Sequence, residues 1–426
     1  MIVPPDSKQP PSYESHVSDL NPLSTVKHTR LHAFSNGRKR LILMVDSRGP
    51  SEESLPIFFE GETITGSVEL HLDKAERNLT HVELFINGHV GKIDPPLESK
   101  PIFEHAETLW DSSLGDPRET AAGQSSQSSK PHTLLGRYTW SFSFAIPRHF
   151  EASKIVRSRT SQTHKLPPSL SEGAGFVSYA IGTKIKRKTT LNPIQKWLFF
   201  FRYRLTNPHD IIIHRLSTFF VYAPRSEPAS FSPLRQAAYR ENTPLLGPEN
   251  DPQGWKVFPS VVMSGRYDLH EFFDVNLRCT LALANPLSYT SGTVIPLAMM
   301  LESVDEKILG SSFISRPYFP KIKFYRKIRG EGSTEDYILA TWSILEDPQH
   351  TPSPLKRMLY GEIKLPQDLT PSFDLGNVFV KYVVEMFTST TRGYTTEKEG
   401  VRFRTNVQIV TDCAPGPRPR QYHNAT

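Results

Sequence analysis

An internal repeat is the feature that most constrains the fold of this chain. The segment LPPSLSEGAGFVSYAI at residues 166–181 aligns without gaps with LTPSFDLGNVFVKYVV at residues 369–384, and seven of the sixteen positions are identical. In both copies a Pro-Ser turn leads through a Gly into an apolar stretch that contains a Tyr. Solenoid units repeat about every 20–50 residues, which is much shorter than the spacing of these copies. The repeat therefore predicts two similar domains in tandem.

Apolar and polar residues alternate over much of the chain, which is the period of a half-buried β-strand. The alternation is clear in residues 57–72, 137–147 and 401–411. The 36 Pro and 24 Gly residues break the chain into short elements, and the 25 Phe and 15 Tyr residues favour strands over helices. We therefore expect an all-β protein. Within LTHVELFINGHVGKI (79–93), the pair Asn87-Gly88 predicts a tight turn.

Composition divides the chain into five parts. Residues 1–37 and 413–426 are polar and rich in Pro, and we expect both to be disordered tails. Residues 38–223 hold one series of predicted strands, and residues 256–412 hold another. The Pro-rich residues 224–255 between them predict an interdomain linker.

Charge and cysteine content exclude several classes of protein. The formal net charge of +6 over 426 residues is too mild to predict a nucleic-acid partner. The two cysteines, Cys279 and Cys413, form no CxxC pair and indicate a reducing compartment without a disulfide framework. We expect no export signal, because the first residues lack a basic start followed by an apolar run, and we expect no membrane span, because no window approaches the required length of about 20 apolar residues. We expect a soluble, cytoplasmic protein.

Three segments resemble the arrestin family: IFFEGETITGSVEL (57–70), LPPSLSEGAGFVSYAIGTKIKR (166–187) and SYTSGTVIPLAMMLES (288–303). The resemblance extends in pieces over about residues 38–412, and it implies two tandem arrestin-like β-sandwiches of the immunoglobulin type. The chain is most similar to alpha-arrestins, which are trafficking adaptors common in fungi and animals. It departs from visual-type arrestins, because it has no recognisable charged polar core or phosphate-sensing C-terminal strand, features that alpha-arrestins generally lack.

The N-terminal tail contains a Pro-Pro-x-Tyr motif, Pro10-Pro11-Ser12-Tyr13. Two prolines favour the extended polyproline II conformation, which the aromatic groove of a WW domain binds, and the Tyr fills a second pocket. In alpha-arrestins this motif recruits HECT-type ubiquitin ligases. The resemblance therefore implies that Pro10, Pro11 and Tyr13 bind a WW domain. The alternative is a chance match in a Pro-rich chain, since many relatives carry the motif after their second domain.

A run of basic residues ends the predicted strand 175–188: Lys184, Lys186, Arg187 and Lys188. Such a run could contact anionic lipid headgroups or an acidic cytosolic partner, and each charge contributes about 1 kcal/mol near an anionic surface. The alternative interpretation is a solvated strand end with no partner.

No residue pattern is typical of an enzyme. GxSxG, GxxxxGK and GxGxxG are all absent. His28 and His32 have HxxxH spacing, but they lie in the expected tail and have no third ligand nearby. We therefore assign no catalytic residue, metal or cofactor.

The resemblance implies a non-enzymatic adaptor that acts at the plasma membrane or endosomes. It would bring a HECT-type ubiquitin ligase to cytosolic segments of membrane transporters or receptors, and so promote their ubiquitination and endocytosis. The alternative is an arrestin-fold scaffold, or a sorting or coat component, that works without a ligase.

Overall fold

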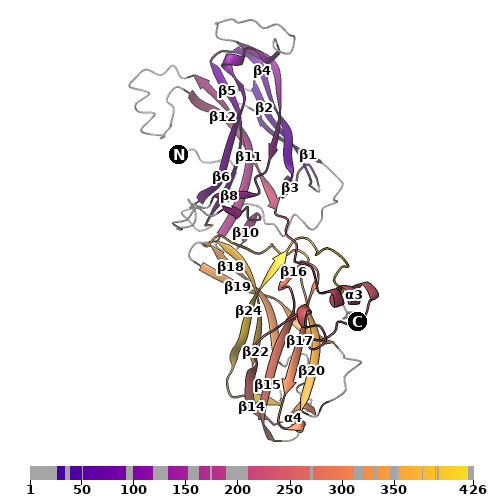
Figure 1. The fold of residues 1–426 in the computed structure, drawn as a ribbon. Coiled ribbons are helices and arrows are strands. Elements are labelled where there is room, and N and C mark those ends of the chain that lie inside the picture. Colours follow the sequence, from indigo (N-terminus) through magenta and orange to yellow (C-terminus); the bar gives the residue numbers. More distant parts are fainter. Residues whose placement is uncertain are drawn as a thin grey trace. The chain divides into compact units, whose positions relative to one another are not determined.

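The structure is a computed structural model with two compact units, Met1–Ala223 and Pro224–Thr426, and each is described by itself. The described residues are 26–33, 39–49, 51–92, 99–118, 133–151, 163–172, 175–188, 210–268, 272–310, 314, 320–330, 333–345, 353, 355–376, 378–388, 390 and 393–420. Strands dominate the regular structure of these residues, which confirms the all-β prediction (Figure 1).

The first unit contains two sheets and a separate strand pair. Its elements are β1 (Val26–Ala33), β2 (Lys39–Ser47), β3 (Ile57–Phe59), β4 (Thr63–Glu76), β5 (Leu79–Lys92), β6 (Ser99–Asp111), η1 (Ser112–Leu114), β7 (Leu134–Ala145), β8 (His149–Glu151), β9 (Thr163–Lys165), β10 (Leu170–Glu172), β11 (Gly175–Lys188) and β12 (Asp210–Ala223). One sheet has the order β1-β2-β4-β7, and the other has the order β3-β12-β11-β5-β6 with β10 beside β11. β8 pairs with β9 alone.

The alternating pattern of the sequence explains the core of this unit. In β2, Leu41 and Leu43 are fully buried while Ile42 between them is only half-buried. Side chains of the two sheets meet at Trp110 of β6 and Trp140 of β7, whose ring centroids are 6.4 Å apart. Burying one large apolar side chain contributes about 1.5–3 kcal/mol, so these alternating residues account for much of the stability.

Two expectations for the first unit differ from the structure. Part of the expected N-terminal tail forms β1, which pairs antiparallel with β2, so that His28 lies opposite Val45. Its sequence, VKHTRLHA, contains few apolar residues and therefore does not show the pattern of a half-buried strand. The predicted turn at Asn87-Gly88 is also absent, because β5 runs through both residues. Gly88 is needed there for another reason: a Cβ atom would lie 2.8 Å from the Tyr179 ring.

The second unit forms one continuous sheet with short helices around it. Its elements are α3 (Pro233–Glu241), η3 (Pro252–Gly254), β13 (Trp255–Val257), β14 (Val261–Tyr267), β15 (Phe273–Ala284), β16 (Ser288–Thr290), β17 (Val294–Glu302), α4 (Glu306–Gly310), β18 (Lys321–Gly330), β19 (Ser333–Leu345), β20 (Lys356–Lys364), β21 (Phe373–Asp374), β22 (Phe379–Thr388), β23 (Tyr394–Thr396) and β24 (Gly400–Val410). The strand order is β16-β24-β22-β18-β19-β20-β17-β15-β14-β23, with β13 beside β15 and β21 beside β22.

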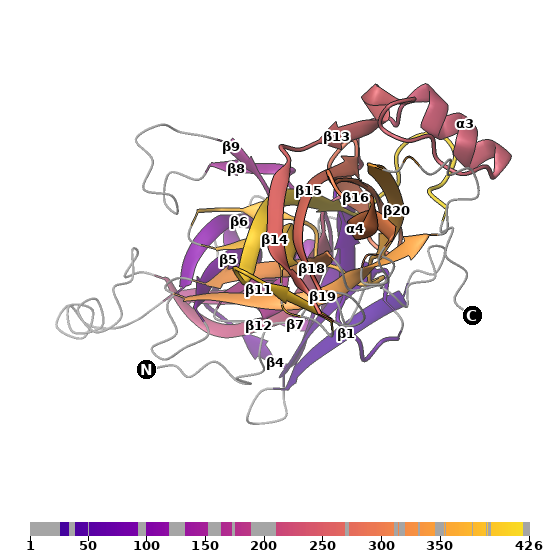
Figure 2. The ribbon, with the colours of Figure 1, turned by 90° about the horizontal axis from the view of Figure 1, so that it is seen from below.

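The segment expected to be a linker, residues 224–255, is an ordered part of the second unit. It contains α3, which begins after Ser232, whose side chain accepts a hydrogen bond from the Arg235 backbone N–H. The helix ends at Asn242, which has a left-handed conformation with φ 59°. Figure 2 shows α3 outside the strands of this unit, next to β13.

The start of the expected C-terminal tail is ordered as well. We call residues 224–255 the α3 segment. Ala414 packs with Phe231 and Tyr239 of this segment, and the Asp412 N–H donates to the Ser226 carbonyl at 2.8 Å. Residues 224–255 and 411–414 therefore contact each other and are both ordered parts of the second unit.

The two units repeat one strand order. The run β3-β12-β11-β5-β6 of the first unit corresponds to β16-β24-β22-β18-β19 of the second, and β1-β2-β4-β7 corresponds to β14-β15-β17-β20. In each unit one short strand of this run is parallel to its neighbour, β3 to β12 and β16 to β24.

The sequence repeat produces the same hydrogen bond in both units. The Tyr179 hydroxyl donates to the Pro167 carbonyl at 2.7 Å, and the Tyr382 hydroxyl donates to the Thr370 carbonyl at 2.7 Å. We call these two bonds the tyrosine locks. All four residues lie within or beside the repeated segment, so the repeat identified from sequence is a structural one.

Candidate functional site

The Pro-Pro-x-Tyr motif lies outside the described residues. Pro10, Pro11 and Tyr13 precede Val26, which is the first residue that the structure describes. Binding of a WW domain by these residues therefore stays a prediction.

The basic run ends β11, which lies between β5 and β12 in its sheet (Figure 1). Lys184 and Lys186 alternate with Thr183 and Ile185, which are buried in the core. Because successive side chains of a strand point to opposite faces, Lys184 and Lys186 lie on the face away from the core. The predicted strand is confirmed, and the orientation of its lysines follows from the alternation.

The basic residues differ in their surroundings. The Lys186 ammonium forms an ion pair with the Glu83 carboxylate of β5. Arg187 and Lys188 are exposed at the end of the strand. The Lys188 backbone N–H donates to the Asn78 carbonyl at 2.8 Å, which fixes the strand end but leaves both side chains in solvent. These two residues fit the solvated strand end that was the alternative interpretation.

Lys184 lies opposite a second cation. The register of β11 and β12 pairs Lys184 with Arg215. The Lys184 ammonium is 4.6 Å from the centroid of the Phe85 ring, and the Arg215 guanidinium carbon is 4.5 Å from the same centroid. Each cation–π contact contributes about 0.5–1 kcal/mol at an exposed site. We call Lys184 and Arg215 the cation pair, and Phe85 is the ring on which both lie.

Gly182 allows this arrangement. A Cβ atom at residue 182 would lie 2.4 Å from Phe85 Cζ and 2.4 Å from the Leu216 carbonyl oxygen. The absence of a side chain therefore lets the Phe85 ring approach the backbone of β11 at residue 182, where the ring contacts cations from two strands.

Charges of both signs surround Lys184, which lies opposite Arg215 of β12 on one side and opposite Glu83 of β5 on the other. Like charges directly opposite each other on neighbouring strands are destabilising. Burial lowers the pKa of Lys184, and the Arg215 charge lowers this pKa further, while the Glu83 and Glu104 carboxylates act in the opposite direction. Among the residues that the structure describes, no ion pair joins either cation to a carboxylate, and Glu83 is bonded to Lys186.

This arrangement can bind an anion. Lysine offers an ammonium with three N–H donors, and arginine offers a planar fork of donors that matches a carboxylate or phosphate. Lys184 is half-buried and Arg215 is exposed, so both are accessible from solvent.

Sequence analysis identified Lys184 but missed Arg215 and Phe85. Each of these three residues lies on a different strand, and their contact depends on the register of β5, β11 and β12. No spacing within the sequence reports that register. The available signal was Gly182, because a Gly in the middle of a strand indicates a close approach by another group.

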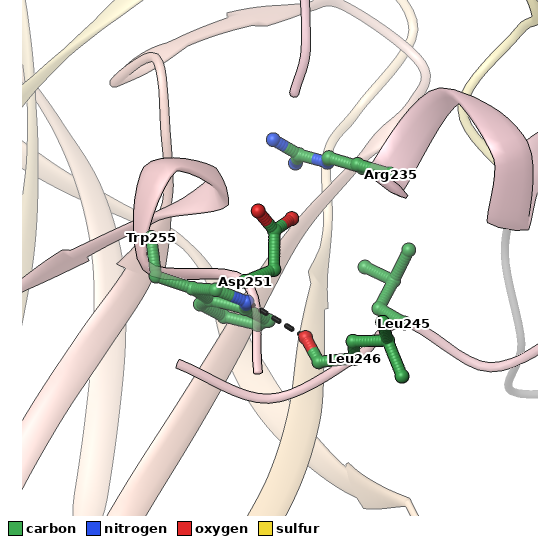
Figure 3. Close-up of a pocket in the computed structure, with 5 residues that line it drawn as sticks. All are labelled: Arg235, Leu245, Leu246, Asp251 and Trp255. Carbon is green, nitrogen blue, oxygen red and sulfur yellow. Dashed lines mark hydrogen bonds between the residues drawn. The ribbon is translucent and has the colours of Figure 1, made fainter. Parts of the chain in front are cut away.

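A hollow in the second unit was the other candidate site. It is lined by Arg235, Leu245, Leu246, Asp251 and Trp255, and it is too tight to admit a water molecule (Figure 3).

The polar groups around this hollow are satisfied within the protein. The Arg235 guanidinium donates to the Asn285 carbonyl at 2.7 Å and to the Tyr239 hydroxyl at 3.1 Å. The Trp255 indole N–H donates to the Leu246 carbonyl at 2.8 Å (Figure 3). These residues attach the α3 segment to the sheet, so their role is structural.

The described residues contain no group of three or more His, Cys, Asp or Glu side chains that could hold a metal ion. His28 is fully buried in β1, and the side chain of His32 lies outside the described part of the chain. Within the same part, no helix is long and apolar enough to cross a membrane.

Comparison with known proteins adds no family assignment. No protein-family model matches the chain, and no curated protein matches it.

Proposed function

We propose that this protein is a non-enzymatic trafficking adaptor of the alpha-arrestin type. It recruits a HECT-type ubiquitin ligase through Pro10, Pro11 and Tyr13, and it binds cytosolic segments of membrane transporters or receptors. The ligase then ubiquitinates this cargo and promotes its endocytosis. The protein acts in the cytoplasm and is recruited to the plasma membrane or endosomes.

The Pro-Pro-x-Tyr motif is the observation that carries the proposal. Tyr13 precedes β1, so a ligase bound at the motif is joined to the first unit by the chain between residues 13 and 26. A polyproline segment loses little conformational entropy on binding, and a short motif is therefore sufficient to recruit a WW domain.

The repeated strand order supports the arrestin part of the proposal. The resemblance implies two similar β-sandwiches in tandem, and each unit of this chain contains the same succession of strands. The tyrosine locks occur at matching positions in both units, as expected for two copies of one domain.

The test measures binding of a purified WW-domain array from a HECT ligase to the full-length chain. We expect binding in the micromolar range, and Tyr13→Ala should abolish it because the second pocket of the WW domain is left empty. Tyr422→Ala is the matched control, because Tyr422 follows Arg420-Gln421 rather than two prolines. Its binding should equal that of the unmodified chain.

Equal binding by the unmodified chain and Tyr13→Ala, or no binding by either, would refute recruitment through this motif. The protein would then be an arrestin-fold scaffold, or a sorting or coat component, that works without a ligase.

A further inference from the structure

One edge of β6 is open in the first unit, whereas the second unit covers the corresponding edge. In the repeated strand order β6 corresponds to β19, and β19 pairs with β20. In the part of the chain that the structure describes, β5 is the only strand that pairs with β6. The other edge of β6 therefore presents backbone N–H and C=O groups that a further strand can pair with.

The middle of this edge is regular and exposed. The pairing of β5 with β6 has two bulges, and between them the register runs without a shift from Glu83–Thr108 to Gly88–Phe103. Residues 104–108 within this stretch are all exposed. Alternate residues of a strand in a sandwich normally face the other sheet, so a continuous exposed stretch means that neither face of β6 is covered here.

Two of the exposed residues belong to the core face of the sheet. Glu107 and His105 lie opposite Leu84 and Ile86 of β5, which are both buried. Residues directly opposite each other share a face. The His105 ring also contacts the Phe144 ring of β7, with 4.7 Å between the centroids. The core face of β6 therefore opens to solvent beside β7, where an added strand has room for its side chains.

The charge of this edge indicates the kind of strand that fits it. Glu104 and Glu107 are three positions apart, so they lie on opposite faces of β6. Among the described residues no ion pair joins either carboxylate to a cation, although the Glu104 charge acts on His89 and Lys184. Opposite charges on directly opposed residues stabilise a strand pair. The matching strand therefore carries two cations at the same spacing.

We propose that the free edge of β6 binds an extended, basic segment of a partner protein by strand addition. The segment pairs its backbone with residues 104–108 and places Lys or Arg side chains opposite Glu104 and Glu107. Main-chain hydrogen bonds provide the affinity in this mode of binding, and the side chains provide the specificity. The segment occupies the place beside β6 that β20 occupies beside β19. This inference goes beyond the proposed function and does not rest on ligase recruitment.

A second copy of this chain fits the edge less well. Pairing of β6 with its own copy brings the glutamates of two strands together, and like charges opposite each other are destabilising. Charged side chains on an edge strand can also serve only to prevent such pairing. A purely protective role predicts self-association when the charges are removed, so the two roles give different results in one set of variants.

The experiment uses the full-length chain and a fluorescein-labelled peptide, Thr-Val-Lys-Thr-Val-Lys-Thr-Val, whose lysines are three positions apart. Fluorescence anisotropy at low ionic strength gives the Kd. Glu104→Gln combined with Glu107→Gln should weaken binding about fivefold, because two cross-strand charge pairs are lost. Hydrogen exchange measured by mass spectrometry should slow in β6 when the peptide binds, while exchange in β11 and β12 stays unchanged.

A second peptide separates strand addition from attraction between charges. Replacing the central Thr-Val by Pro-Pro keeps both lysines but removes two backbone donors and disrupts the strand. This peptide should bind at least about tenfold more weakly and leave exchange in β6 unchanged, because it cannot form the ladder of hydrogen bonds.

The matched control variant is Glu241→Gln combined with Glu249→Gln, which removes the same charge from exposed residues of the second unit. It should change the Kd less than about twofold, since exposed charges far from a contact are screened. Glu104→Asp combined with Glu107→Asp keeps both charges and should retain binding within about threefold. Circular dichroism of every variant shows that the fold is kept.

Five results would overturn the proposal. The Lys peptide does not bind, or the two Gln pairs weaken it equally, or the Pro peptide binds as well as the first. Slow exchange throughout residues 104–108 before any peptide is added would mean that another part of the chain already covers the edge. Self-association of Glu104→Gln combined with Glu107→Gln, with peptide binding unchanged, would make the glutamates protective only. The assay contains no WW domain and Tyr13→Ala should not affect it, so its failure is distinct from failure of ligase recruitment.

Discussion

The two units share a strand order, but their sheets are connected differently. In the second unit β19 pairs with β20, with Trp342 opposite Ile363, and this pairing joins all the strands into one sheet. The corresponding strands of the first unit, β6 and β7, belong to separate sheets in the part of the chain that the structure describes. They meet through side chains, as Trp110 and Trp140 do. The second unit also carries the α3 segment, which has no counterpart among the described residues of the first.

This comparison separates the residues that maintain the fold from those that make a site. The positions shared by both copies, such as Tyr179 and Tyr382, form the same buried hydrogen bond. One of the positions that differ lies on the outer face, where the first unit has Gly182 and the second has the carboxylate of Glu385. A duplicated domain can keep its core and change its outer face, because the two faces of a strand consist of alternate residues.

The largest loss of stability is expected when Trp255, which packs on the sheet of the second unit, is replaced. Trp255 packs against Ala282, Ala284 and Ala298, and its replacement by Ala should cost about 3–5 kcal/mol. Hydrogen exchange measured by mass spectrometry should show faster exchange in β15 and β17, with the first unit unchanged.

Val257→Ala on the same strand is the control for Trp255→Ala. Val257 is 52% exposed, so its replacement should leave exchange almost unchanged. Equal acceleration in both units after Trp255→Ala would show that they unfold together and would remove the basis for treating them as separate.

A smaller loss of stability is expected when Gly182, on the outer face of β11, is replaced. Gly182→Ala places a Cβ atom 2.4 Å from the Leu216 carbonyl oxygen, which is backbone and cannot rotate away. Overpacking of this kind costs about 1–3 kcal/mol, and exchange in β11 and β12 should increase accordingly. Gly310→Ala is the control, since nothing lies within 4 Å of a Cβ atom there. Unchanged exchange in the first unit after Gly182→Ala would contradict the close approach of the Leu216 carbonyl and the Phe85 ring to residue 182.

The tyrosine locks should have equal effects. Tyr179→Phe and Tyr382→Phe each remove one hydroxyl that donates to a carbonyl at 2.7 Å. Each change should cost about 1 kcal/mol in its own unit, which denaturant unfolding combined with hydrogen exchange would resolve. A loss in one unit only would mean that the repeat has kept its sequence without keeping its role.

Sequence patterns predicted the strands that have one buried face. β4 and β24 appear where the alternation is clear, and the repeat indicated the positions of the tyrosine locks. β1 was missed because its fully buried residue is His28, which a hydropathy pattern counts as polar. α3 was missed because tertiary contacts stabilise it: Arg235 bonds to Asn285, which lies far along the chain.

Of the cation pair, only Lys184 could be identified from the sequence. It belongs to the basic run, but nothing in the sequence distinguishes it from Lys186, Arg187 and Lys188. What distinguishes Lys184 is its cross-strand neighbour, and strand pairing between distant segments cannot be deduced from one sequence.

The smallest effect on strand stability is expected in β1. It is compared with β14, which has the corresponding place in the second unit but also pairs with β23. β1 contains the fully buried His28, whose pKa is lowered from its usual value of 6.5. Burial is the largest cause, and the Arg30 charge adds to it, while the Glu52 carboxylate and the backbone at residues 52 and 54 act in the opposite direction. β14 contains no histidine.

The lowered pKa of His28 determines whether acid strengthens or weakens the pairing of β1 with β2. When β1 separates from β2, His28 regains its usual pKa of 6.5 and binds a proton more readily than it does in the folded state. The pairing of β1 is therefore weakened as the pH falls below 6.5. Hydrogen exchange, corrected for its intrinsic pH dependence, should show β1 opening more readily on acidification while β14 does not change. His28→Leu removes the titrating group, and β1 of this variant should respond to acid as β14 does. An acid response that survives in His28→Leu would assign the effect to other groups, and β1 and β14 would then differ for a reason other than this histidine.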